Sequence, residues 1–255
     1  MSSDTIPVVS VQNISKTFSR SNDEDLHVLQ DVSFDLEQGE FVGVIGYSGC
    51  GKTTLLRIIC GFEKHEDGLV LIDGLQHDKP KRNVLMLFQE FNQLFPWKTV
   101  LQNVIHPLLA TGFIDDKAKA KSHAMKRIAD VRLAGFENSF PHELSGGMKQ
   151  RAAVARALAL QPRVLLLDEP FASVDSITRR SLQVLTRRVC DKYGVSVIFV
   201  THNVEEALIM ADRIIVVTGT PGRIDRIFEN TGRESKDETK RAELAREILS
   251  LLEKE

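Results

Sequence analysis

The sequence predicts an α/β fold built around a largely parallel sheet. Short β-branched runs recur along the 255 residues, and several of them are apolar nearly throughout. Continuous apolar runs suit strands that are buried on both faces of a parallel sheet. Helical patterns alternate with these runs, as in the α/β layer class. The predicted strands cover residues 8–11, 41–45, 69–72, 84–88, 164–167, 195–200 and 214–217.

The composition is that of an ordinary globular protein. Hydrophobic residues make up 42% of the chain and charged residues 27%, which excludes disordered and fibrous classes. The 33 Lys and Arg nearly balance the 35 Asp and Glu, and the net charge of −2 argues against a dedicated nucleic-acid binder. The 3 cysteines suit neither a disulfide framework nor a zinc site.

No segment is expected to span a bilayer. The longest stretch without Asp, Glu, Lys or Arg, residues 99–114, contains Gln102, Asn103, His106 and Pro107. The N-terminus lacks the basic-then-apolar pattern of a secretion signal. We therefore expect a soluble cytosolic protein.

Helices are predicted between the strands and in the middle third of the chain. Leu182, Leu185 and Val189 share one face of a helix that ends at Gly194, a favourable residue for a helix C-terminus. Residues 117–131 are also helical in pattern. We predict one domain over residues 1–255, with residues 90–143 as an inserted helical subdomain. Residues 233–255 form a C-terminal helical tail whose apolar stripe comprises Ala242, Leu244, Ile248, Leu251 and Leu252.

A phosphate-binding loop is predicted between the strand at 41–45 and the helix that follows residue 52. The motif G-x-x-x-x-G-K-[ST] covers residues 46–53. Gly46, Gly49 and Gly51 permit turns in which successive N–H groups point at phosphate oxygens, and the helix N-terminus adds positive charge. Lys52 is expected to reach the β- and γ-phosphates, and the Thr53 hydroxyl to bind Mg²⁺.

Two carboxylates follow the apolar run 164–167. Asp168 is expected to hold Mg²⁺ through water, and Glu169 to polarise the water that attacks the γ-phosphate. A pair of acidic residues after a strand is weak by itself, because charged residues commonly end buried strands.

A second glycine turn lies just upstream. Residues 144–151 read Leu-Ser-Gly-Gly-Met-Lys-Gln-Arg, in which Ser145, Gly146 and Gly147 open a predicted helix. Such a turn suits phosphate binding, although an ordinary helix N-cap is the favoured explanation of Ser-Gly-Gly when it is taken alone.

Taken together, these motifs resemble the ATP-binding subunit of ABC transporters. The resemblance covers nearly the whole chain. It rests on residues 46–53, Gln89, residues 144–151, Asp168 and Glu169, residues 172–175 and His202, in this order and spacing. It implies a P-loop NTPase fold of the ABC type, with an N-terminal antiparallel β region.

The resemblance also implies how ATP is bound and hydrolysed. Two copies of the chain would close head to tail around two ATP molecules, each held between the phosphate loop of one copy and Ser145 to Gly147 of the other. Glu169, His202 and Gln89 match the catalytic groups, and Thr53, Gln89 and Asp168 the Mg²⁺ site. The nucleotide contacts would be Phe18, Gly46, Tyr47, Ser48, Gly49, Cys50, Gly51, Lys52, Thr53, Thr54, Ser145, Gly146, Gly147 and Asp175.

Two of these roles have structural alternatives. Phe18 falls where an aromatic ring stacks on adenine, but it could be an aromatic residue of the core. A histidine after a strand, such as His202, is usually structural.

Cys50 lies inside the phosphate loop, so a thiol reagent should block ATP binding and ATP should protect, unless the thiol is buried and inert.

The segment after Gln89 resembles importers of nitrate, sulfonate, taurine and related small solutes. The resemblance implies a peripheral subunit on the cytoplasmic face of the plasma membrane, working with integral-membrane permease subunits and a separate solute-binding protein. The permease contact would lie at residues 91–97, through Phe91, Leu94, Phe95 and Trp97, unless these side chains fill the helical region's own core.

Three other functions compete with an importer ATPase. A non-hydrolysing nucleotide switch would need Glu169 or His202 to be absent, and both residues are present. A soluble ABC ATPase acting on nucleic acid or ribosomes is disfavoured by the single motif set and the near-neutral charge. An exporter ATPase subunit is distinguished by the membrane protein that co-purifies. Departures such as Asn203 after the histidine, and Ala-Ser-Val-Asp at 172–175, remove no catalytic group, so ATP turnover is expected.

Overall fold

A six-stranded sheet forms the centre of the fold. The computed structural model describes residues 6–19, 25–88, 93–172, 174–232 and 238–253. The sheet has the strand order β10-β9-β3-β8-β7-β6, in which β9 to β6 run parallel and β10 is antiparallel to β9. Its strands are β3 (Phe41–Ile45), β6 (Val84–Leu87), β7 (Val164–Asp168), β8 (Ser196–Thr201), β9 (Arg213–Thr218) and β10 (Arg223–Glu229). The predicted α/β class with a largely parallel sheet is confirmed.

The strand register of this sheet places the loops that follow β3, β7 and β8 at one edge. β8 lies between β3 and β7, with Ile45 opposite Thr201 and Asp168 opposite Val200. Because parallel strands share one carboxyl edge, the segments that follow these strands emerge side by side. All residues of β3, β7 and β8 are buried, as their continuous apolar patterns predicted.

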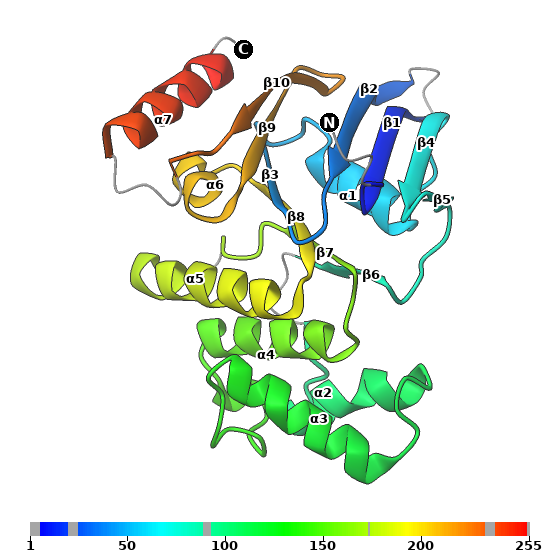
Figure 1. Ribbon diagram of the computed structural model, residues 1–255, viewed down its shortest axis with the longest axis vertical. Coiled ribbons are helices and arrows are strands. Elements are labelled where there is room, and N and C mark those ends of the chain that lie inside the picture. The colour runs from blue at the N-terminus through cyan, green and yellow to red at the C-terminus, as the bar shows by residue number, and fades with distance from the viewer. Residues whose placement is uncertain (1–5, 20–24, 89–92, 173, 233–237, 254–255) are drawn as a thin grey trace.

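A second, four-stranded sheet is antiparallel and has the order β2-β1-β4-β5 (Figure 1, upper right). It comprises β1 (Val9–Phe18), β2 (Leu26–Leu36), β4 (Asp67–Ile72) and β5 (Leu75–Gln76). This sheet confirms the antiparallel N-terminal β region. The helix α1 (Lys52–Cys60) shares one apolar core with both sheets, through side chains such as Leu56, Val9 and Val42.

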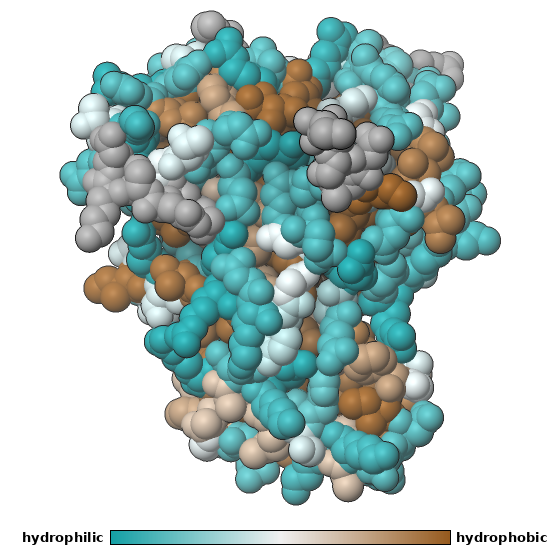
Figure 2. Space-filling view, in the orientation of Figure 1, coloured by the Kyte–Doolittle hydropathy of each residue, from teal (hydrophilic) through white to brown (hydrophobic). Residues whose placement is uncertain are grey.

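The middle of the chain is helical, as predicted (Figure 1, lower half). Over the described residues 93–142 it contains α2 (Val100–Ala110), α3 (Lys117–Asp130) and the start of the 3₁₀ turn η2 (Pro141–Glu143), without a strand. α2 and α3 pack on α4 (Gly146–Ala159), and their apolar faces join one core with the larger sheet. Figure 2 shows brown apolar side chains at the lower end of the molecule, around α2.

Three further helices occur in the described part of the chain. α5 (Ser176–Tyr193) buries Leu182, Leu185 and Val189, and it ends at Gly194 with a φ of 61°, so both predictions are confirmed. It is followed by α6 (Val204–Met210), and α7 (Glu238–Leu252) lies near the C-terminus. α7 buries Ile248, Leu251 and Leu252 but leaves Ala242 exposed, so the predicted stripe is too long at its start. Among the described residues, no helix has the length and apolar character needed to cross a membrane.

Candidate functional site

The phosphate loop connects β3 to α1 through backbone that glycine favours. Gly49 and Gly51 have φ values of 91° and 90°, in the left-handed region. A Cβ at Gly51 would lie 2.7 Å from Leu29 Cδ2 and 2.9 Å from the Val28 carbonyl oxygen. A side chain at this position would therefore be both strained and crowded.

Backbone carbonyl groups of this loop hold the Lys52 side chain in place. The side chain is buried, and its ammonium donates hydrogen bonds to the carbonyl oxygens of Gly46 (2.7 Å) and Tyr47 (2.6 Å). The charge thus lies at the start of α1, where the helix N-terminus also favours an anion. Cys50 is 3% exposed, and this burial favours the inert-thiol alternative over the reactive cysteine.

Thr53 and Asp168 form the oxygen-rich part of the site. The Thr53 hydroxyl donates a hydrogen bond of 2.9 Å to Asp168 Oδ1. Burial raises the pKa of Asp168, the hydrogen bond from Thr53 opposes that shift, and the neighbouring Glu169 carboxylate adds to it. A hydroxyl and a carboxylate side by side suit Mg²⁺, which takes one or two protein oxygens together with phosphates and water. No cluster of three or more His, Cys, Asp or Glu suited to a metal occurs in the described part of the chain.

Glu169 and His202 meet at the same sheet edge. They follow the ends of β7 and β8, and His202 Nδ1 lies 3.2 Å from Glu169 Oε1. Glu169 has a φ of 42°, and its N–H donates to the Val200 carbonyl oxygen (3.1 Å), which ties the residue to β8. The pair therefore places a carboxylate, able to accept a proton, beside an imidazole.

A cavity of about 380 Å³ lies over the phosphate loop. Phe18, at the end of β1, lines it, and the Lys16 ammonium lies 4.6 Å from the centre of the Phe18 ring. Leu26 and Val28 of β2 add an apolar wall that was not predicted, although the alternation of residues along 26–28 is a strand signal. The cavity is lined by Phe18, Leu26, Val28, Ser48, Gly49, Gly51, Lys52, Thr53, Thr54 and Glu169.

The second glycine turn lies elsewhere. Ser145 caps α4 by accepting from the Met148 N–H (3.3 Å), and Asp175 caps α5 by accepting from the Thr178 N–H (3.0 Å). A Cβ at Gly147 would lie 2.6 Å from Thr178 Cγ2, so the two helix starts are adjacent. Ser145, Gly146, Gly147 and Asp175 are not among the described residues that line the cavity over the phosphate loop.

The residues expected to contact the permease differ in their exposure to solvent. Gln89 and Phe91 lie outside the described residues. Leu94 is 3% exposed and belongs to the core with α2 and α3, which favours the core alternative for this residue. Trp97 is 69% exposed.

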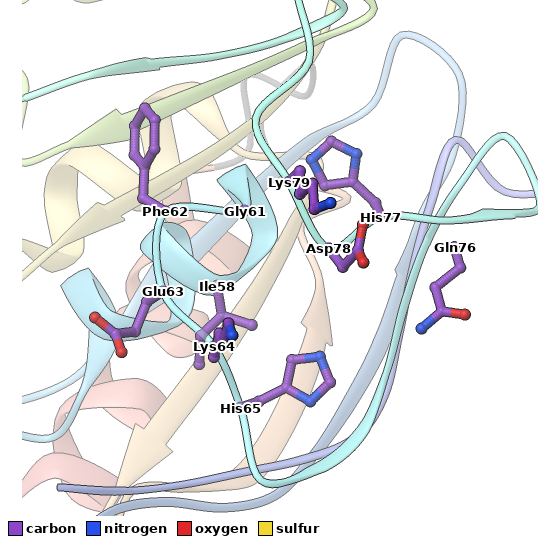
Figure 3. A pocket seen from close by; sticks show the side chains of 10 residues that line it. All are labelled: Ile58, Gly61, Phe62, Glu63, Lys64, His65, Gln76, His77, Asp78 and Lys79. Carbon is purple, nitrogen blue, oxygen red and sulfur yellow. The ribbon is translucent and has the colours of Figure 1, made fainter.

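A larger cavity, of about 490 Å³, lies at the other end of α1 (Figure 3). It is lined by Ile58 of α1, by the turn 61–65 after α1, and by residues 76–79, which begin at the end of β5. At its margin Phe62 stacks on Phe88 with ring centres 6.2 Å apart, and both rings are partly exposed. Phe88 directly precedes residues 89–92 in the chain.

Comparisons with known proteins identify the family to which the chain is similar. A profile of the family described as ABC transporter matches residues 29–172. The aliphatic sulfonates import ATP-binding protein SsuB of Bacillus cereus is 41% identical over 96% of this chain and 96% of its own length. The nitrate import ATP-binding protein NrtC of Synechococcus elongatus is 38% identical over 87% of this chain and 34% of its own. The bicarbonate transport ATP-binding protein CmpC of Synechocystis sp. is 41% identical over 84% and 32%.

A solved structure is similar as well. A dimeric ATP-binding cassette, described as a post-hydrolysis state bound to ADP and Pi, superposes with a TM-score of 0.76 and 32% identity. The similarity covers 88% of this chain and 99% of that one.

Proposed function

Because the chain belongs to the ABC transporter family, we propose that it is the ATP-hydrolysing subunit that energises the import of a small anionic solute. The observation that carries this proposal is the convergence of the phosphate loop with Asp168, Glu169 and His202 on one sheet edge. ABC ATPase activity needs a phosphate cradle, a cation site and a group that activates water, and this edge supplies candidates for all three.

Each part of the edge has a distinct task in the proposed reaction. The loop N–H groups and Lys52 bind the phosphates of ATP, and Phe18, which lines the cavity, would stack on the adenine. Thr53 and Asp168 would hold Mg²⁺, which would neutralise the charge that develops on the phosphates. Glu169 accepts a proton from the attacking water, and His202 contacts the γ-phosphate. Gln89 is the remaining residue proposed for catalysis and for Mg²⁺ binding, and it lies outside the described residues.

The proposed active unit is a dimer of this chain. Ser145, Gly146 and Gly147 lie at the start of α4, away from the cavity in the same chain, and helix N-termini attract anions. A second copy would bring them to the γ-phosphate, with Asp175 at the contact. The dimeric state of the similar cassette supports this assembly.

The proposed membrane partners are permease subunits that meet exposed aromatic side chains. The ring centres of Trp97 and Phe95 lie 5.6 Å apart, and the Phe62–Phe88 pair flanks the larger cavity. Exposed aromatic residues are enriched at protein interfaces. This contact would place the chain at the cytoplasmic face of the membrane. The proposed helical subdomain covers residues 90–143, and the proposed C-terminal tail covers residues 233–255.

The proposed solute class comes from the relatives. Their names specify import or transport of aliphatic sulfonates, nitrate and bicarbonate, all of which are small oxyanions. A separate solute-binding protein would select among them, since this chain contacts only nucleotide and permease in the proposed complex.

The test is to isolate the Glu169→Gln variant from native membranes in Mg-ATP and identify its partners. Recovery with permease subunits of an oxyanion importer supports the proposal. Recovery with ribosomes or DNA and no membrane protein contradicts it, and recovery with an exporter contradicts the direction of transport.

A further inference from the structure

Glu206 is a buried carboxylate that the proposed reaction does not use. It lies on α6 and is 5% exposed. Its Oε2 accepts a hydrogen bond from the Thr201 hydroxyl, and its Oε1 accepts one from the Gln183 amide (3.4 Å). Buried carboxylates without a structural or functional reason are rare, because burial of charge is costly.

The hydroxyl of Thr201 links Glu206 to the turn that carries His202. Thr201 ends β8, and its Oγ1 also accepts a hydrogen bond from the Asn203 N–H (3.0 Å). This contact spans His202 and closes a tight turn around it. Asn203 in turn accepts from the Glu206 N–H (3.2 Å) and caps α6. The three residues thus form a closed ring of hydrogen bonds on both sides of the histidine.

The His202 side chain has little packing of its own to orient it. It is 58% exposed, and its ring nitrogen contacts Glu169 Oε1 at 3.2 Å. An exposed side chain takes its direction from the backbone that carries it. A loosened turn would therefore move the imidazole relative to Glu169 and to the γ-phosphate of bound ATP.

We propose that Glu206 is a positioning residue, which holds His202 in its working place through the Thr201 hydroxyl. The inference rests on the proposed function, in which His202 contacts the γ-phosphate. A merely structural Glu206 would stabilise α6 and β8 without a specific effect on the step that His202 serves.

The experiment compares steady-state ATP hydrolysis by the full chain and its variants at saturating Mg²⁺. Glu206→Ala is expected to lower kcat by about tenfold or more while KM for ATP stays within about twofold, because misplaced catalytic groups lose rate rather than binding. Glu205→Ala, on the same helix and exposed, is the matched control and keeps the wild-type kcat. Thr201→Val is expected to reproduce the loss, and Thr201→Ser, which keeps the hydroxyl, to restore most of the rate.

A double-mutant cycle separates positioning from general stability. In a His202→Ala background, Glu206→Ala and Thr201→Val are expected to cause no further loss of kcat, because the residue they position is absent. Multiplicative losses in that background would overturn the proposal. If Glu206→Ala fails to fold by circular dichroism, Thr201→Val carries the same test. A wild-type chain without ATPase activity would instead contradict the proposed function.

Discussion

The hydroxyl of Thr53 lies 2.9 Å from Asp168 Oδ1 and donates a hydrogen bond to it, although 115 positions separate the two residues. The bond joins the first turn of α1 to the end of β7. It orients the buried Asp168 carboxylate toward the phosphate loop. One contact therefore belongs to both the proposed cation site and the proposed nucleotide site.

Removing this hydroxyl should impair the use of Mg²⁺. Thr53→Val is expected to lower kcat for ATP hydrolysis by about 10–100-fold, because one oxygen ligand of Mg²⁺ is lost. For the same reason it should raise the Mg²⁺ concentration that gives the half-maximal ATPase rate. Thr53→Ser keeps the hydroxyl and should stay near the wild type. Mg²⁺ titrations of the ATPase rate measure both effects, and identical curves for Val and Ser would exclude Thr53 as a ligand.

Neutralising Glu169 should separate ATP binding from hydrolysis. Glu169→Gln is expected to lower kcat at least about 100-fold, since the amide cannot accept the proton of the attacking water. The phosphate cradle is unchanged, so ATP affinity measured with a fluorescent analogue should change less than about twofold. Glu205→Gln makes the same chemical change at an exposed site and should leave both quantities alone. Wild-type turnover in the Glu169 variant would rule it out as the base.

A methyl group at Gly51 should disrupt the phosphate loop. Gly51→Ala adds a Cβ within 2.7 Å of Leu29 and forces alanine to a φ of 90°. Positive φ alone costs about 1–2 kcal/mol. Gly39→Ala is the matched control, because its φ is 75° and nothing lies within 4 Å of the new Cβ. We expect ATP affinity, measured by equilibrium titration, to fall more than about tenfold in Gly51→Ala only; equal losses in both variants would refute the crowding argument.

Asp130 should stabilise the fold in a pH-dependent way. It accepts hydrogen bonds from Lys192 (2.6 Å) and Tyr193 (2.5 Å), which connect α3 to α5. Burial alone would raise the pKa of Asp130, but these two hydrogen bonds and the positive charges of Lys192 and Arg127 together lower the pKa below its usual value. A lowered pKa means that the stabilisation is present above the unfolded-state pKa, near 4, and is lost as the pH falls through the folded-state value.

Urea unfolding of Asp130→Asn at several pH values tests this effect. The variant is expected to lose about 1–3 kcal/mol of unfolding free energy at pH 7, and the difference from the wild type should shrink as the pH falls below about 4. Asp115→Asn, at an exposed position before α3, should show no such loss. A pH-independent difference would contradict the ionic contribution.

The cysteines should be inert in the folded chain. Burial raises the pKa of the Cys60 thiol to about 12 and does the same for Cys190, while Cys50 is 3% exposed. Thiolates are the reactive species, so we expect no labelling by a thiol reagent at pH 8 under native conditions and reaction of all 3 cysteines in denaturant. Rapid native labelling of Cys50 that ATP prevents would restore the reactive-cysteine interpretation.

Local patterns in the sequence predicted the central strands and the phosphate loop. β3, β7 and β8 are continuous apolar runs, and such runs are legible because both faces of these strands are buried. β2 was missed, since its exposure varies along the strand and its pairing with β1 contains bulges. Leu94 and Trp97 look alike as apolar residues, but only packing against α2 and α3 separates the buried one from the exposed one.

The sequence by itself determined which chemical groups the chain carries and the order in which they occur, because motifs and strand patterns depend on adjacent residues. Only the tertiary structure decided which groups meet. β8 inserts between β3 and β7, and this order brings Thr53 to Asp168 and His202 to Glu169. It also decided that Glu206 lies buried beside Thr201 and that Cys50 is shielded. Such contacts depend on the packing of distant segments, which no local pattern records.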